Sequence, residues 1–182
     1  LKSNVNDLDK YLDGIFSTIV YKDIMARNNI TDKLLLESVI KYIFDSIGSP
    51  ISIKKISDTL TSKGISTSNH TVENYITALL ESFLIYKVER FDVKGKNLLA
   101  RDYKYYVADS GLRSYLLGKK ADSDMGHILE NIVYLELLRR GYKVYVGKVG
   151  ELEVDFVAEN RNGLKYYQVA LSVRDEKVLE RE

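Results

Sequence analysis

The stretch that decides the fold is Leu84–Val107, LIYKVERFDVKGKNLLARDYKYYV. Around Leu84–Val88 and again around Tyr103–Val107, apolar side chains recur at every second position, the period that is typical of β-strands. Between these two runs, Lys94-Gly95-Lys96-Asn97 is rich in turn-forming residues. The pattern therefore predicts a β-hairpin with a long, basic tip at residues 91–101.

The chain before this hairpin has helical spacing instead. A first helix is predicted over residues 11–24, and a second over residues 35–47, where Thr31 or Asp32 can cap its start. Ser52 begins a short third helix, which ends at Gly64, and a fourth covers residues 68–83.

Three helices followed by a hairpin are the order of elements in a winged helix-turn-helix. We place this domain at residues 34–108, with residues 68–83 as the recognition helix and residues 91–101 as the wing. Residues 1–33 form a separate helical segment before it.

A different unit follows the hairpin. Residues 109–123 are predicted to be a short helix and a polar linker. Asp124 is predicted to cap a long apolar helix that stops at Gly141, and strand-like runs cover residues 143–146, 152–157 and 165–171. The order is α-β-β-β, and we assign this small domain to residues 124–182.

Composition limits the classes of function. The 182 residues carry a net charge of +1 and contain no cysteine. Disulfide frameworks, thiolate nucleophiles, zinc ribbons and iron–sulfur sites are therefore excluded. No apolar run reaches the roughly 18 residues of a membrane span, and no global charge attracts nucleic acid or a membrane. We expect a folded, cytoplasmic protein without a membrane partner.

The two ends of the sequence look cut. The chain begins without methionine, its first nine residues have neither the charged nor the apolar region of a signal peptide, and it stops inside a charged stretch at residues 174–182. We expect a fragment of a longer protein.

The last unit contains three short motifs with polar residues, one on its helix and one on each of its last two strands. They are G-x-x-x-E ending at Glu130, then Glu153-Val154-Asp155, then Gln168-Val169-Ala170. On strands, Glu153 and Asp155 share a face, as do Gln168 and Ala170. This order and spacing resemble the PD-(D/E)XK nuclease superfamily, most closely its Holliday-junction-resolvase-like branch, over about residues 124–172.

The resemblance implies a restriction-endonuclease-like fold with a Mg²⁺ site at Glu130, Asp155 and Gln168, where a metal-bound water attacks phosphate. Two residues depart from the pattern, because Gln168 replaces an acidic ligand and Ala170 replaces the lysine. Losing one acid/base group costs about 10²- to 10⁴-fold in rate, so we infer a nuclease fold without catalysis. A purely structural role for Glu130 and Asp155 remains open.

A wider resemblance covers almost the whole chain. Tyr11-Leu12-Asp13-Gly14-Ile15, Tyr21-Lys22-Asp23-Ile24, the winged helix and the nuclease-like motifs follow one another as in the C-terminal region of prokaryotic AAA-type ATPases. The resemblance implies that an ATP-binding module precedes this region and that residues 1–33 are the end of its helical lid. No phosphate-binding loop occurs in this chain, so we expect it to hold no ATP and no other cofactor.

The start of the predicted recognition helix carries polar residues that can reach bases or phosphates. These are Ser68, Asn69, His70, Thr71 and Asn74. The helix has no lysine or arginine and is acidic, however, so contact with a protein is the alternative.

Positive charge gathers on the hairpin instead. Residues 85–120 hold nine basic and four acidic side chains, and we expect Lys94, Lys96 and Arg101 to contact phosphate. The two histidines, His70 and His127, have no partner at metal-ligand spacing.

These observations predict an α+β chain: a winged helix-turn-helix plus a small α-β-β-β restriction-endonuclease-like domain. As its function we expect the C-terminal arm of an AAA-type ATPase, which recognises DNA or a protein partner and also contacts its own ATPase module. Two alternatives stay open. One is a Mg²⁺-dependent, structure-specific DNA endonuclease that recruits another lysine, such as Lys148 or Lys165. The other is a protein interaction scaffold without DNA binding.

Overall fold

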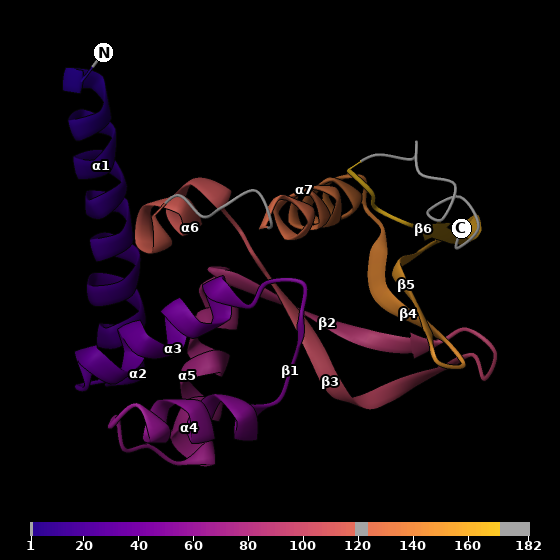
Figure 1. Cartoon of the computed structure of the whole chain (residues 1–182), viewed down its shortest axis with the longest axis horizontal. Helices are drawn as coiled ribbons and strands as arrows, with labels where there is room; N and C mark the ends of the chain where they lie inside the picture. The colour runs from indigo at the N-terminus through magenta and orange to yellow at the C-terminus, as the bar shows by residue number, and fades with distance from the viewer. Residues whose placement is uncertain (1, 119–123, 172–182) are drawn as a thin grey trace. The chain divides into compact units, whose positions relative to one another are not determined.

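The computed structural model describes residues 2–118 and 124–171, without the side chains of residues 2–6 and 100–102 (Figure 1). It is a mixed α and β structure that divides into two compact units. The first unit comprises Leu1–Ser46, Ile51–Tyr86 and Val107–Lys120. The second comprises Ile47–Pro50, Lys87–Tyr106 and Ala121–Glu182.

The first unit begins with a long helical stretch. It consists of the α-helix α1 (Lys2–Ser17), the π-helix η1 (Thr18–Met25) and the short helix α2 (Ala26–Asn28). The helix predicted over residues 11–24 is thus confirmed. Phe16, Val20 and Ile24 are buried along one side of it. Asn29 has a left-handed backbone with φ 52° and ends the stretch, a conformation that asparagine tolerates better than most residues.

Three further helices pack together behind it: α3 (Lys33–Asp45), α4 (Ile53–Ser62) and α5 (Asn69–Glu81). Each begins at a side chain that accepts a hydrogen bond from a backbone amide three residues on. Asp32 accepts from Leu35 N at 2.9 Å, Ser52 from Lys55 N at 3.2 Å, and Ser68 from Thr71 N at 3.1 Å. The three predicted helices and their capping residues are therefore confirmed.

Helix α6 (Ser110–Leu117) completes the first unit and is capped by Asp109, whose side chain accepts from Leu112 N at 2.9 Å. Arg113 is buried and donates to the Phe44 carbonyl at 2.7 Å, which ties α6 to the end of α3. The predicted helix within residues 109–123 is confirmed, whereas the linker predicted after it lies outside the described residues.

The described strands form a six-stranded sheet in the order β1-β3-β2-β4-β5-β6. They are β1 (Pro50–Ile51), β2 (Ile85–Asp92), β3 (Asn97–Val107), β4 (Lys143–Val149), β5 (Leu152–Asn160) and β6 (Gly163–Tyr167). The predicted hairpin is confirmed as β2 and β3. Its turn is shorter than predicted, because the strands continue to Asp92 and from Asn97.

In the second unit, the outer part of the hairpin belongs with the later strands. Strand β2 pairs in parallel with β4, with Arg90 opposite Val146, and the Phe91 and Tyr145 rings stack at 5.6 Å. This pairing gathers Lys87–Tyr106 into the second unit, whereas the sequence predicts one winged-helix domain at residues 34–108.

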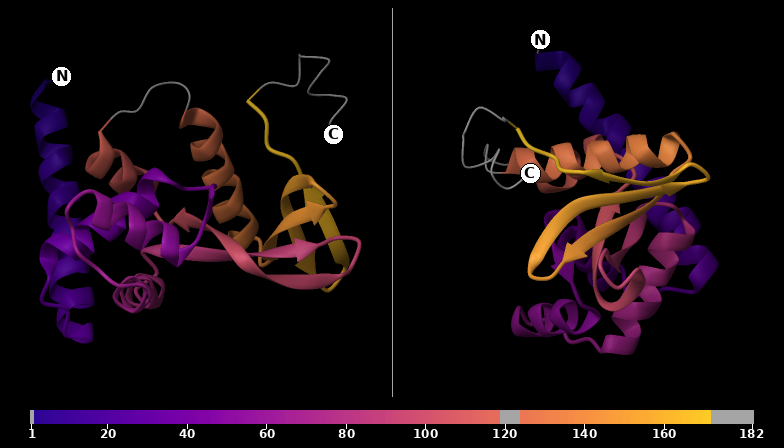
Figure 2. Two further views of the ribbon diagram at one scale, coloured as in Figure 1. Left: turned by 60° about the horizontal axis from the view of Figure 1, so that its bottom comes forward. Right: turned by 90° about the vertical axis from the view of Figure 1, so that its right-hand side faces the viewer.

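Helix α7 (Met125–Arg139) packs on β4 and β5 (Figure 2). The predicted α-β-β-β order is therefore present. Two details of the prediction are wrong: Asp124 makes no capping hydrogen bond through its side chain, and β6 ends at Tyr167 rather than at residue 171. Strand pairing stops there because the next amide that could bond to β5, that of Val169, donates to the Asp155 side chain instead.

Among the described helices, none has the length and apolar character needed to cross a lipid bilayer.

Candidate functional site

A buried cluster of charged residues forms the centre of the second unit. Helix α7 carries Glu130 on its inner side, where 8% of the residue is exposed. The Tyr106 hydroxyl donates to Oε1 of Glu130, and Lys104 Nζ donates to the same oxygen at 3.1 Å. Both donors come from β3, where residues two apart share a face. A carboxylate at this depth is thus held by one cationic and one neutral donor.

Lys104 also binds a second carboxylate. Its Nζ lies 2.6 Å from Oε1 of Glu153 on β5, and only 3% of the lysine side chain is exposed. Arg90 on β2 approaches the other oxygen of Glu153 at 3.8 Å. One lysine therefore bridges Glu130 and Glu153, which the sequence places 23 residues apart.

The environment shifts the pKa values of this cluster. Burial disfavours the charged form of Lys104, but Glu130 and Glu153 outweigh it, so its pKa is raised and the lysine remains charged. Burial raises the pKa of Tyr106 strongly, and the nearby Glu130 raises it further, so the phenol remains a neutral donor. The cluster is a set of hydrogen-bonded ion pairs at neutral pH.

Asp155 and Gln168 meet beside this cluster. The amide of Val169 donates to Oδ2 of Asp155 at 2.7 Å, and the amide of Asp155 donates to Oε1 of Gln168 at 3.3 Å. Burial raises the pKa of Asp155, although the Val169 amide and Lys104 lower it. The structure thus brings together two of the sequence-predicted ligands and attaches both to backbone. Ala170 lies after β6, half-buried, and offers no polar group.

The predicted Mg²⁺ site can be tested against these contacts. Among residues 2–118 and 124–171, no three histidine, aspartate or glutamate side chains are placed to hold a metal ion together. Lys104 lies between Glu130 and Glu153, and Asp155 accepts a backbone amide. A cation at this place would meet an ammonium group, so the residues as arranged do not fit Mg²⁺.

His127 and Gly48 lie at the edge of the cluster. The Nδ1 atom of His127 is 4.0 Å from Oε2 of Glu130 and has no hydrogen-bond partner within the described part of the chain. A Cβ atom on Gly48 would lie 3.0 Å from that nitrogen and 3.1 Å from that oxygen. Gly48 therefore lets the chain pass close to Glu130, a role that the sequence does not indicate.

The start of α5 is mostly occupied by local contacts. Ser68 is the helix cap. Its hydroxyl oxygen accepts a hydrogen bond from the backbone amide of Thr71 and also bonds to the Thr71 hydroxyl. Asn69 accepts a hydrogen bond from the Ser57 hydroxyl on α4. His70 and Asn74 are exposed and bond to each other at 3.3 Å. Five residues of this helix start are predicted to contact DNA. Of these, His70 and Asn74 are the exposed residues that bond neither to the helix cap nor to α4.

The predicted phosphate-binding residues lie on or near the hairpin turn. Lys94 and Lys96 are exposed, and Lys94 N donates to the Asp92 side chain at 3.0 Å, which shapes the turn. Lys96 has a left-handed backbone with φ 50°. Arg101 belongs to β3, but its side chain lies outside the described residues.

The sequence interpretation misses Lys104 and Tyr106. A signal for both exists: Tyr103-Lys104-Tyr105-Tyr106-Val107 holds one charged residue in an otherwise apolar run, and residues 104–107 are all buried. A lysine at such a place needs an acidic partner. The structure also shows that Lys165 lies over the Tyr142 ring at 5.7 Å, so Lys104 is the lysine that meets the acidic residues.

Fold and site together define a mixed α and β protein with a buried lysine–glutamate centre. Residues 1–123 match the model of a protein family described as a domain of unknown function, DUF8612, and the chain belongs to that family. Lys104 and Tyr106 lie within the matched region, whereas their partners Glu130 and Glu153 follow it.

Two curated relatives are similar over most of this chain. An uncharacterised protein of Haemophilus influenzae is 44% identical over 162 residues, which are 89% of this chain and 40% of the relative. An uncharacterised protein of Methanocaldococcus jannaschii is 31% identical over 159 residues, 85% of this chain and 34% of the relative. The chain thus spans less than half the length of either. No solved structure matches it.

Proposed function

We propose that this chain is a non-catalytic recognition arm of an AAA-type ATPase, built from a winged helix and a nuclease-like unit, and that it binds DNA through the tip of its hairpin. The observation that carries the proposal is the position of Lys104. Its ammonium group bonds to Glu130 and Glu153 at 3.1 and 2.6 Å, and Arg90 lies 3.8 Å from Glu153, so two cations of the protein itself balance these two carboxylates. A centre of this kind supports a structural role.

The exposed lysines support contact with nucleic acid. Lys94 and Lys96 flank Gly95 at the hairpin turn, and neither has an acidic partner within the described residues. Phosphate contacts dominate the affinity of proteins for DNA, and free ammonium groups on a turn are suited to them. On α5, the exposed pair His70 and Asn74 can add polar contacts.

The lengths of the relatives support the arm of a larger protein. The matched region is 40% of the Haemophilus protein and 34% of the Methanocaldococcus protein, which leaves room in both for an ATP-binding module. The ATPase itself is therefore part of this proposal rather than of the described chain.

DNA binding is tested with labelled duplex and four-way-junction DNA in a salt series, with Mn²⁺ present. We expect binding that weakens with salt and leaves the DNA intact. The double variant Lys94→Ala/Lys96→Ala should reduce the slope of log K against log salt by about 1.8, the value for two phosphate contacts. The matched control is Lys10→Ala/Lys22→Ala, which removes the same charge from two exposed residues of α1 and η1.

Each other outcome contradicts one part of the proposal. Equal loss in both double variants would mean that net charge, not the hairpin, governs binding. Cleavage of the DNA would show that the nuclease-like unit is active. No binding at any salt concentration would leave a protein partner as the function of this arm.

A DNA endonuclease is the second candidate, and one observation favours it. Lys104 brings a lysine into the acidic centre, where the sequence lacks one at Ala170. If the chain cleaves DNA, Lys104→Met and Asp155→Asn should each abolish cleavage. The variant Lys165→Met should keep it, because Lys165 lies at the Tyr142 ring.

A further inference from the structure

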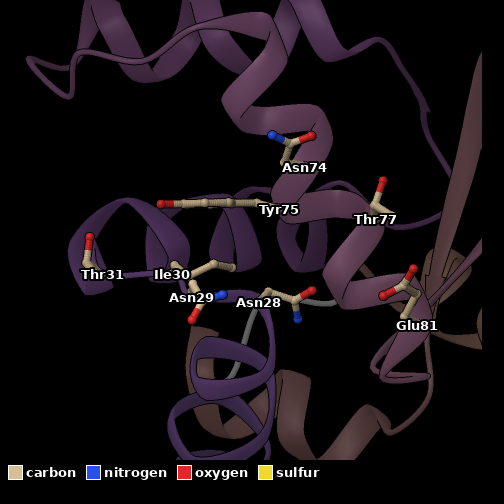
Figure 3. Close-up of a pocket in the computed structure, with 8 residues that line it drawn as sticks. All are labelled: Asn28, Asn29, Ile30, Thr31, Asn74, Tyr75, Thr77 and Glu81. Atoms are coloured by element: carbon tan, nitrogen blue, oxygen red, sulfur yellow. The ribbon is translucent and has the colours of Figure 1, made fainter.

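A hollow in the first unit lies between the end of α2 and the C-terminal half of α5 (Figure 3). Its volume is about 450 Å³, within the usual range of about 300–1,000 Å³ for ligand sites. Residues 28–31 form one wall, and the other wall consists of Asn74, Tyr75, Thr77 and Glu81. Asn29, whose backbone is left-handed, lies in the first of these walls.

Two of the side-chain donors in the hollow already bond to backbone carbonyls. The amide nitrogen of Asn28 donates to the Ile24 carbonyl at 2.9 Å, and the Thr77 hydroxyl donates to the Glu73 carbonyl at 3.0 Å. What these two side chains still offer is acceptor oxygen: the Asn28 carbonyl and the lone pairs of Thr77. Together with the Glu81 carboxylate, which can only accept, these oxygens suit a ligand that donates hydrogen bonds.

The charge of the hollow has one sign. Glu81 is the charged residue among the eight that line it. The carboxylate is exposed and makes no ion pair with any residue that the structure describes. In Figure 3, the Asn28 amide and the Glu81 carboxylate point toward one another across the hollow. A cation between them would meet acceptors from both walls.

A guanidinium group matches these features better than an ammonium group. It carries five donors in one plane together with a permanent positive charge, so it can bond to several acceptors at once. The Tyr75 ring extends along one side of the hollow, and planar cations are attracted to aromatic rings.

The openness of the hollow indicates how the group arrives. Six of its eight lining residues are exposed, so a small molecule held there would remain largely in water. Sites for free small ligands usually bury 70–90% of the ligand. A side chain that is anchored by the rest of its own polypeptide does not need such enclosure.

We propose that this hollow binds an arginine side chain that a partner protein presents. This interaction differs from DNA binding through the hairpin, since it uses the C-terminal half of α5 and opposite charge; Asn74 is the residue that both proposals use. The arginine would supply Glu81 on α5 with a positively charged partner, whereas DNA phosphates would repel this carboxylate.

The test is a titration of the ¹⁵N-labelled chain with the capped peptide acetyl-Gly-Arg-Gly-amide, followed by NMR. We expect saturable shifts of the amides of residues 28–31 and 74–81. Glu81→Gln keeps the shape of the side chain and should weaken binding about tenfold or more, as expected for a hydrogen bond to a charged group. Glu73→Gln, an exposed change on the same helix outside the lining, should leave affinity unchanged.

Three further ligands separate the parts of the proposal. A peptide with citrulline, which has the same shape without the charge, should not bind, and one with lysine should bind more weakly than arginine. Free arginine should bind more weakly than the capped peptide. Equal binding of citrulline would overturn the role of charge, and equal binding of free arginine would make the ligand a small molecule. Absence of saturable shifts with the arginine peptide would overturn the site.

Discussion

The helix starts of the first unit and the buried cluster of the second satisfy their polar side chains in different ways. In the first, Asp32, Ser52 and Ser68 each bond to an amide three residues away, and they do so at exposed helix ends. In the second, Lys104 is buried and bonds to Glu130, 26 residues away. Local capping fixes where helices begin, whereas the buried ion pairs hold separate elements of one unit together. The second arrangement should therefore be far more sensitive to substitution.

Removal of the buried lysine should have the largest effect. Lys104→Met keeps an apolar stem of similar length but leaves the buried Glu130 without its lysine and Glu153 with Arg90 alone. Breaking a buried ion pair on one side typically costs about 3–5 kcal/mol, because the remaining charge is uncompensated. We expect a loss of this size in the free energy of unfolding, measured by urea denaturation.

Two further variants test whether the loss comes from the unpaired charge or from the change of side chain. Lys94→Met makes the same chemical change at an exposed position, where the effect should stay within about 0.5 kcal/mol. Lys104→Met/Glu130→Gln removes one of the stranded charges and should be more stable than Lys104→Met alone. If the double variant were less stable than the single one, the ion pair would not be the source of the loss.

The close approach of the chain to Glu130 should give the next largest effect. Gly48 has φ 69°, and a Cβ atom there would lie within 3.1 Å of both His127 and Glu130. Gly64, in the first unit, has φ 83° and open space around it. Gly64→Ala should cost about 1–2 kcal/mol for the backbone alone. Gly48→Ala should cost about 1–3 kcal/mol more, the usual range for overpacking.

Both glycines have a positive φ, so both variants lose stability through backbone strain. The difference between their free energies of unfolding therefore measures the contact of the new Cβ atom with His127 and Glu130. Both are measured by urea denaturation under the same conditions. Equal losses in the two variants would indicate that His127 and Glu130 move aside freely. The buried cluster would then be looser than its hydrogen bonds suggest.

The contrast between the units also explains what the sequence can predict. Helices α3, α4 and α5 follow from apolar spacing and a capping residue within a few positions, so they are predicted almost to their ends. Glu130, Glu153 and Asp155 stand out because a known motif orders them. Lys104 stands out only as a charge in an apolar run; its partners come from α7 and β5, and no local pattern identifies them.

The same reasoning covers the predictions that the structure corrects. Residues 168–170 have the alternation of a strand, but the Val169 amide bonds to the Asp155 side chain rather than to β5. The sequence places the outer hairpin with the winged helix, and the structure pairs it in parallel with β4 of the second unit. Both findings depend on contacts between distant segments, which periodicity does not contain.

A helix cap in the first unit should show a smaller effect than either change in the second. Ser68→Ala removes the acceptor for the Thr71 amide and should cost about 1 kcal/mol in the free energy of unfolding. Ser66→Ala, at an exposed position before the helix, is the matched control and should be neutral. A loss as large as that of Lys104→Met would contradict the difference between the two units.

The smallest effect is expected at Asp155, and its sign is informative. Burial raises the pKa of this carboxyl above its unfolded value, so ionisation opposes folding. The stabilising contribution of the protonated form is complete below about pH 4, the unfolded pKa, and is lost as pH rises through the folded pKa. In the native chain, an oxygen of Asp155 accepts a hydrogen bond from the Val169 amide at 2.7 Å. Asp155→Asn keeps an oxygen that can accept this bond and removes the cost of burying a charge.

Unfolding of Asp155→Asn should therefore be measured from pH 3.5 to pH 7.5 against the native chain. We expect equal or slightly higher stability of the variant near neutrality and no advantage at the acidic end. A clear loss at pH 7 would mean instead that the Val169 amide and Lys104 stabilise the ionised carboxylate by more than burial destabilises it. If the expected gain is found, the chain retains at Asp155 a carboxylate that its fold does not require, which would argue that this residue has a role outside stability.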